Sequence, residues 1–280
     1  MKTFKNLILL TICVFSMTVQ AQHESFEVEV KGKGDPILLL PGFSCTGDVW
    51  KDIVSELSKT NECHIFTFAG FGDVPAIETP WLSKIKEGLT HYISKNKLEK
   101  STIIGHSLGG ILGLWLAADE NSNYNKIVVI DALPSAGALM VPNFNSETIV
   151  YDNPYNLRLL NMDATSFDAM ASQMARTMSL NKEKHILIKE WILKTDRKTY
   201  VYGYTDLLKL DLRETVAKIT SPVIIFAATK PYGEDLVKKT YEEQYKNLNS
   251  YSITYVKQSA HFIMFDQPEW LLSAIKVELQ

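Results

Sequence analysis

Short apolar runs alternate with helical patterns along most of the chain from Phe26 onward. Residues 26–30 alternate strictly between apolar and polar side chains, which predicts an early antiparallel strand. Further strands are predicted at 37–40, 64–68, 102–104, 127–130, 222–227 and 251–256. The run at 37–40 is continuously apolar, as in a parallel strand buried on both faces. Helical patterns occur at 48–57, 80–98, 108–118, about 235–245 and 268–277. This rhythm predicts an α/β fold with a doubly wound, mostly parallel sheet.

The rhythm stops between residues 134 and 204, where no convincing strand pattern is found. Apolar side chains recur there near helical spacing, as at Phe167, Met170, Met174 and Met178. A chain of 280 residues fits one large domain, or one domain with an inserted subdomain. We therefore expect a core of residues 22–133 and 205–280 and a helical insertion, or cap, of residues 134–204. The apolar stripe fits packing against the core, or an adaptable lid over a pocket.

The segment around Ser107 combines a strand, a sharp turn and a helix. A β-branched run at 102–104 leads into Gly105-His-Ser-Leu-Gly109, and small and apolar residues follow. In the G-x-S-x-G arrangement a strained turn lifts the serine hydroxyl clear of the sheet, and the glycines allow strand and helix to approach. We predict that Ser107 is a nucleophile. The alternative is a tight turn whose serine caps the helix.

A nucleophilic serine needs a general base, and the most suitable histidine is His261. It follows the strand at 251–256, so its loop opens at the carboxyl edge of the sheet, where the Ser107 turn also opens. His106 is expected to point elsewhere because neighbours on a tight turn diverge, and His64 begins its predicted strand at the opposite edge. The remaining histidines, His23, His91 and His185, are less well placed. His91 and His185 lie on predicted helical segments.

Acyl transfer also needs two N–H donors for the oxyanion. One is expected from the backbone of Leu108, directly after the nucleophile. The other is expected from Phe43, because Pro41-Gly42-Phe43 follows the strand at 37–40. An ordinary strand-to-helix turn would carry the same glycine.

The N-terminus resembles a secretory signal peptide. Lys2 and Lys5 precede an apolar run from Leu7 to Val19, and small-residue cleavage is possible before Gln22. The run is too short for a stable membrane span. We therefore predict a signal peptide of residues 1–21 and a secreted or periplasmic protein.

Charge and cysteine content bear on the expected partners and on disulfide formation. Removal of residues 1–21 takes away two lysines and no acids, and moves the formal net charge from −3 to −5. Without a basic patch, nucleic acid is not an expected partner. Cys45 and Cys63 lie at opposite ends of neighbouring predicted strands, about 20 Å apart, so we expect two free thiols.

Several of these segments, in this order, resemble the α/β-hydrolase superfamily. They are Leu38-Leu-Leu-Pro-Gly-Phe43, Phe68-Ala-Gly-Phe-Gly-Asp73, Gly105-His-Ser-Leu-Gly-Gly110, Ile127-Val-Val-Ile-Asp131 and the stretch that begins His261-Phe-Ile-Met-Phe. The resemblance covers essentially all of residues 26–280. It implies Ser107 as nucleophile, His261 as base and a helical cap over the site.

The third member of the implied triad departs from the family pattern. The family usually has an acid shortly after the strand equivalent to 222–227, but Lys230 occupies that position. A lysine cannot accept the imidazole N–H. Asp131 ends the preceding sheet strand and is the favoured substitute. Asp235 and Glu234 remain alternatives, and all three keep the order serine, acid, histidine.

These expectations define an exported serine hydrolase that cleaves an ester, thioester, lactone or amide of a small molecule with an apolar group. The intermediate is an acyl-enzyme on Ser107, and no cofactor or metal is expected because no ligand or phosphate-loop motif is found. Alternatives are a ligand-binding or sensory protein with little turnover, and a C–C hydrolase or haloperoxidase-like enzyme on the same scaffold.

Overall fold

The computed structural model describes residues 19–23, 25–120 and 122–280. The predicted signal peptide therefore lies mostly outside the described residues. Its last three residues belong to a short strand that the sequence analysis did not predict, β1 (Val19–His23), which pairs antiparallel with β2 (Phe26–Lys31). Cleavage before Gln22 stays a prediction.

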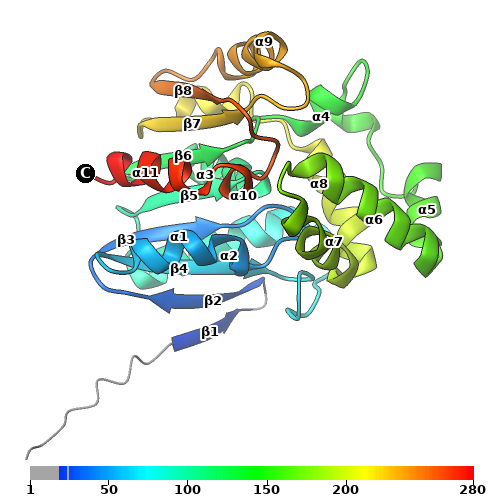
Figure 1. Cartoon of the computed structure of the whole chain (residues 1–280), viewed down its shortest axis with the longest axis horizontal. Helices are drawn as coiled ribbons and strands as arrows, with labels where there is room; N and C mark the ends of the chain where they lie inside the picture. The colour runs from blue at the N-terminus through cyan, green and yellow to red at the C-terminus, as the bar shows by residue number, and fades with distance from the viewer. Residues whose placement is uncertain (1–18, 24, 121) are drawn as a thin grey trace, which may run out of the picture.

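One eight-stranded sheet organises the core, in the order β1-β2-β4-β3-β5-β6-β7-β8. β2 is antiparallel to β4, and the strands from β4 to β8 run parallel, as the sequence predicted. The bounds of these strands are β3 Asp35–Leu40, β4 Asn61–Phe68, β5 Thr102–His106, β6 Lys126–Ile130, β7 Val223–Ala228 and β8 Tyr251–Val256. Figure 1 shows the sheet with helices on both faces.

Alternate residues of β3 show how the two faces are covered. Leu38 and Leu40 pack in one core cluster with α2 (Trp81–Asn96), α3 (Leu108–Ala117) and α9 (Glu234–Tyr245). Ile37 and Leu39 pack in a second cluster with α1 (Lys51–Leu57) and α11 (Pro268–Glu278). All four side chains are fully buried, which explains why the stretch 37–40 of this strand is entirely apolar.

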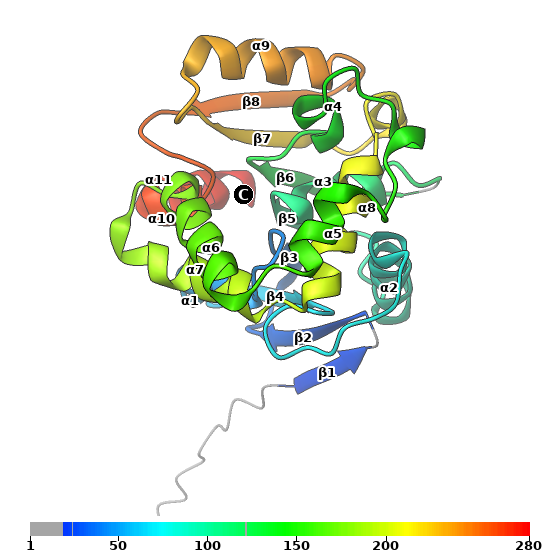
Figure 2. The same ribbon diagram turned by 90° about the vertical axis from the view of Figure 1, so that its right-hand side faces the viewer.

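Between β6 and β7 the chain forms helices and loops without a strand. The α-helices of this insertion are α4 Ala136–Met140, α5 Pro154–Leu160, α6 Ala164–Met178, α7 His185–Lys194 and α8 Tyr204–Lys209. A π-helical turn, η4 (Thr199–Gly203), leads into α8. Figure 2 shows α5, α6, α7 and α8 in front of one end of the strands. The predicted limits of the insertion, 134 and 204, stay a prediction.

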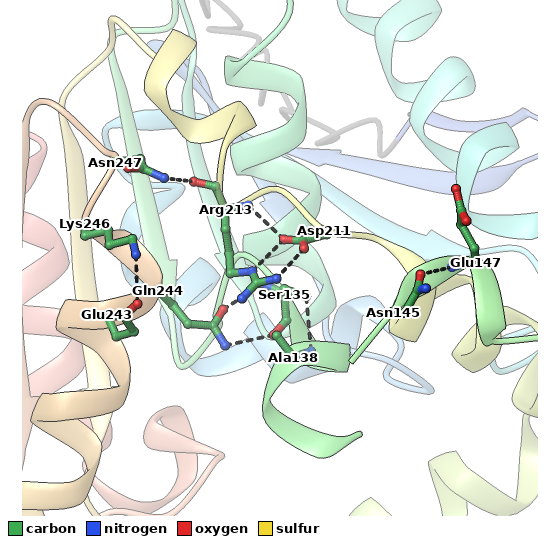
Figure 3. A network of polar contacts seen from close by, with 10 residues as sticks. All are labelled: Ser135, Ala138, Asn145, Glu147, Asp211, Arg213, Glu243, Gln244, Lys246 and Asn247. Carbon is green, nitrogen blue, oxygen red and sulfur yellow. Dashed lines mark hydrogen bonds and ion pairs between the residues drawn. The ribbon is translucent and has the colours of Figure 1, made fainter. Parts of the chain in front are cut away.

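Polar contacts tie both ends of the insertion to α9 and to the residues that follow it (Figure 3). Gln244 is buried on α9, accepts from the Ser135 N–H at 2.9 Å and donates to the Ser135 carbonyl at 3.0 Å. Asn247 donates to the carbonyl of Arg213, where the chain returns to the core. These bonds join the segment that follows β6 and the segment that leads to β7 to the same region, the end of α9.

Candidate active site

Ser107 lies between β5 and α3 in a backbone conformation that few L-residues adopt. Its φ is 51° and its ψ is −117°, and its N–H donates to the Ile130 carbonyl at 2.9 Å. Gly109 must be small, since a Cβ there would lie 2.0 Å from the Leu40 carbonyl oxygen. The half-buried serine makes no side-chain cap to α3, which contradicts the alternative reading of Ser107 as a helix cap.

His261 and Asp131 lie together at the carboxyl edge of the sheet. The Nδ1 of His261 is 2.6 Å from the Oδ2 of Asp131. Asp131 directly follows β6, and its Oδ1 accepts from the Ala228 N–H and the Tyr241 hydroxyl, both at 2.9 Å. Burial, and then the Asp131 charge, raise the pKa of Tyr241 well above its ordinary value, so this hydroxyl stays a donor. The carboxylate is therefore held on both oxygens.

The other two candidate acids lie elsewhere. Glu234 and Asp235 begin α9 and are exposed, and the Glu234 carboxylate pairs with Lys257 at 3.1 Å. Lys230, at the position where the family's acid is usual, is also exposed, and its backbone N–H donates to the Ser259 carbonyl. Of the three acids weighed from the sequence, Asp131 is the one that the structure joins to His261.

Three hydrogen bonds fix the backbone around His261. The Ala260 N–H donates to the Oδ2 of Asp266 at 2.7 Å, and the Phe262 N–H donates to the Met178 carbonyl at 3.0 Å. The His261 carbonyl itself accepts from the Nε2 of His106 at 3.0 Å. The loop that carries His261 is thus anchored to the insertion and to the end of β5.

The candidate oxyanion loop lies against the Ser107 turn. A Cβ on Gly42 would be 3.4 Å from the Cβ of Ser107, so the loop backbone passes directly beside the serine. Leu108 directly follows Ser107, begins α3 and is fully buried. The half-buried ring of Phe43 contacts the rings of Tyr200 and Tyr204 from the insertion, with centroid separations of 6.0 and 5.3 Å.

Two histidines differ from their sequence-based interpretation. His106 is fully buried, and its ring packs on that of His261 with a centroid separation of 4.6 Å, so it contacts the site. The sequence feature that could have indicated this contact is the position of His106 inside the G-x-S-x-G turn, directly before Ser107. His64 does not begin its strand, because β4 starts at Asn61, and its ring bonds to Tyr92 and Glu62 inside the core. His64 has a structural role.

No cluster of three or more histidine, cysteine or acidic side chains that could hold a metal is found in the described part of the chain. Cys45 and Cys63 are buried free thiols, as the strand layout predicted. Burial raises the pKa of Cys63 to about 11, so this thiol is not poised as a thiolate.

The fold and this strand–serine–helix turn define an α/β hydrolase. Residues 37–274 match the alpha/beta hydrolase family, and the chain belongs to that family of hydrolases.

Among curated relatives, 3-oxoadipate enol-lactonase 1 of Acinetobacter baylyi is 21% identical over 261 residues, which cover 90% of this chain and 92% of the lactonase. A pimeloyl-(acyl-carrier protein) methyl ester esterase of Vibrio vulnificus is 22% identical over 250 residues, covering 86% of this chain and 92% of the esterase.

Among solved structures, the enol-lactonase from Burkholderia xenovorans superposes with a TM-score of 0.75 at 15% identity. The match covers 91% of this chain and 96% of that one, and shows a shared fold. Within residues 19–23, 25–120 and 122–280, no helix has the length and apolar character to cross a membrane.

Proposed function

We propose that this protein is a serine hydrolase that cleaves an ester-like bond of a small molecule through an acyl-enzyme on Ser107. The observation that carries the proposal is the 2.6 Å contact between His261 Nδ1 and Asp131 Oδ2 at the edge where the strained Ser107 turn lies. A carboxylate on Nδ1 fixes the tautomer that leaves Nε2 free to accept a proton.

In the proposed reaction His261 Nε2 takes the proton of the Ser107 hydroxyl as its oxygen attacks the carbonyl carbon. The N–H groups of Phe43 and Leu108 stabilise the negative charge that develops on the carbonyl oxygen. His261 then returns the proton to the leaving group. Water, deprotonated by the same imidazole, attacks the acyl-enzyme and releases the acid and free Ser107.

The substrate is proposed to be a neutral ester or lactone with an apolar group. The rings of Phe43, Tyr200 and Tyr204 form the junction between the oxyanion loop and the insertion, which acts as a cap in this proposal. The thioether of Met174 accepts from the Tyr200 hydroxyl at 3.3 Å, so this junction is lined by soft, uncharged groups. The names of the two curated relatives, a lactonase and a methyl ester esterase, support an oxygen ester.

Fluorophosphonate labelling of the purified protein tests the nucleophile. We expect Ser107→Ala to lose both labelling and hydrolysis of p-nitrophenyl esters, while the matched control Ser273→Ala, an exposed serine on α11, keeps both. A series of acyl chain lengths reads out the apolar preference. Saturable ligand binding without turnover would instead favour a binding protein, and labelled Ser107 without ester turnover would favour a C–C hydrolase.

We further propose that the protein is exported to the periplasm or the medium. The support is Lys2 and Lys5 before the apolar run Leu7–Val19, with Ala21 at the predicted cleavage site. Intact-mass measurement of the protein recovered from periplasmic and medium fractions should give a chain that begins at Gln22. An uncleaved chain confined to the cytoplasm would refute export without affecting the hydrolase proposal.

A further inference from the structure

We propose that His106 is a positioning residue that holds the His261 loop and the oxyanion loop in register with Ser107. This inference rests on the proposed serine hydrolase function and deepens it, because it assigns a role to the residue just before the nucleophile.

His106 is hydrogen-bonded to the backbone of His261. A backbone carbonyl can only accept, so the 3.0 Å contact between His106 Nε2 and the His261 carbonyl requires a proton on Nε2. The ring of His106 also packs against those of His261 and Phe262, with centroid separations of 4.6 and 4.9 Å. One side chain therefore fixes the backbone and limits the ring position of the proposed base.

His106 also contacts the candidate oxyanion loop. A Cβ on Gly42 would lie 2.7 Å from the Nδ1 of His106, so the loop backbone closes directly over this edge of the ring. Since His106 is covalently joined to Ser107, one buried ring touches all three parts of the proposed machinery. A shift of the ring would move the base and the oxyanion donors relative to the nucleophile.

The His106 ring is uncharged. The Nδ1 of His106 is buried and has no hydrogen-bond partner among the described residues. Burial, and then repulsion from His261, hold the pKa of His106 well below its ordinary value. The ring is therefore a neutral Nε2–H donor that adds no positive charge beside the imidazolium that His261 becomes during the reaction.

The test compares two variants of similar shape, one with and one without the donor. The amide of His106→Gln can donate to the His261 carbonyl, whereas the thioether of His106→Met cannot. We expect His106→Met to lower kcat for p-nitrophenyl ester hydrolysis about 10²-fold with KM nearly unchanged, because misplacement by about 1 Å costs this much. We expect His106→Gln to recover at least tenfold of that loss at matched thermal stability.

Equal kcat in the two variants would overturn the inference, and so would a His106→Met enzyme within twofold of the native one. The proposed function is read separately, from native turnover and Ser107→Ala. If the native protein shows no turnover, proton NMR still decides the positioning role. The low-field signal of the His261 Nδ1 proton should persist in His106→Gln and broaden or vanish in His106→Met. Its retention in both variants would refute the inference.

Discussion

Replacement of Asp131 by asparagine tests the proposed acid without changing its shape. The carboxylate accepts from the Nδ1 of His261 at 2.6 Å on one oxygen. On the other oxygen it accepts from the Ala228 N–H and the Tyr241 hydroxyl. An amide can replace one of these two acceptor oxygens but not both.

The surroundings determine which side the amide oxygen takes in Asp131→Asn. The backbone N–H of Ala228 can only donate, so the amide oxygen must face it. The NH₂ group then faces the Nδ1 of His261, which has to accept instead of donate. The ring proton moves to Nε2, and this nitrogen can no longer accept the proton of Ser107.

The expected loss follows from this inverted tautomer. A triad with the wrong tautomer loses about 10⁴ in kcat, equivalent to about 5 kcal/mol of transition-state stabilisation. The unfolding free energy should change by no more than about 1 kcal/mol, because the bonds to Ala228 and Tyr241 survive. Stopped-flow measurement of the p-nitrophenol burst reads out acylation directly. Asp235→Asn and Glu234→Gln serve as matched controls and should retain native rates.

An acylation rate within tenfold of the native protein in Asp131→Asn would refute the assignment. So would an equal loss in Asp235→Asn or Glu234→Gln. A large fall in unfolding free energy together with the rate would show that Asp131 acts mainly as a structural group.

Two further outcomes follow from the same geometry. Gly42→Ala should lower kcat/KM about 10²-fold in the same ester assay. The added Cβ would lie 2.7 Å from the Nδ1 of His106 and would displace the oxyanion loop beside Ser107. A native kcat/KM would contradict this prediction. His106 stays neutral in the fold but takes up a proton below about pH 6.5 when unfolded, so the unfolding free energy should fall by about 1 kcal/mol between pH 7 and 5.5. Urea titrations should show this component in the native protein and not in His106→Gln.

Most of the fold could be predicted because the central strands are buried on both faces and leave continuous apolar runs, as at 37–40 and 127–130. β8 spans Tyr251–Val256, as predicted, and α11 differs from its expected range by one residue at its end. β1 was not predicted, because the first three residues of Val19–His23 were assigned to the predicted signal peptide of residues 1–21. The local sequence pattern does not distinguish a signal peptide from a strand in such a segment.

The site was predictable where a single local turn builds it, and less so where it depends on neighbours in space. Gly105 and Gly109 indicate the tight turn that holds Ser107 in its strained conformation, because they allow strand and helix to approach closely. The choice among Asp131, Asp235 and Glu234 required the order of strands, since all three follow strands or loops at the same edge. The contact between His106 and His261 joins residues 155 positions apart, which no short pattern contains.

The place of the proposed acid has a structural consequence for the base. Ser107 and Asp131 follow β5 and β6, which are neighbours, whereas His261 follows β8 and must reach back across β7. An acid after β7 would lie nearer to the strand that carries the base. Because the acid here follows β6, the loop that carries His261 has to extend past β7. Three hydrogen bonds, to the backbone of Ala260, His261 and Phe262, hold the loop in this position.

Asp266 is the anchor that a single substitution can test. One of its oxygens accepts from Ser179 and from two backbone N–H groups of the insertion, and the other accepts from the Ala260 N–H at 2.7 Å. In Asp266→Asn the amide oxygen stays with the two backbone donors, so the NH₂ group opposes the Ala260 N–H and that bond is lost. We expect kcat to fall about tenfold with little change in KM, because His261 is less firmly placed while the substrate contacts remain. Glu269→Gln, an exposed change on α11, is the control. A raised KM at native kcat would show that Asp266 shapes the substrate site through the insertion and does not position the base.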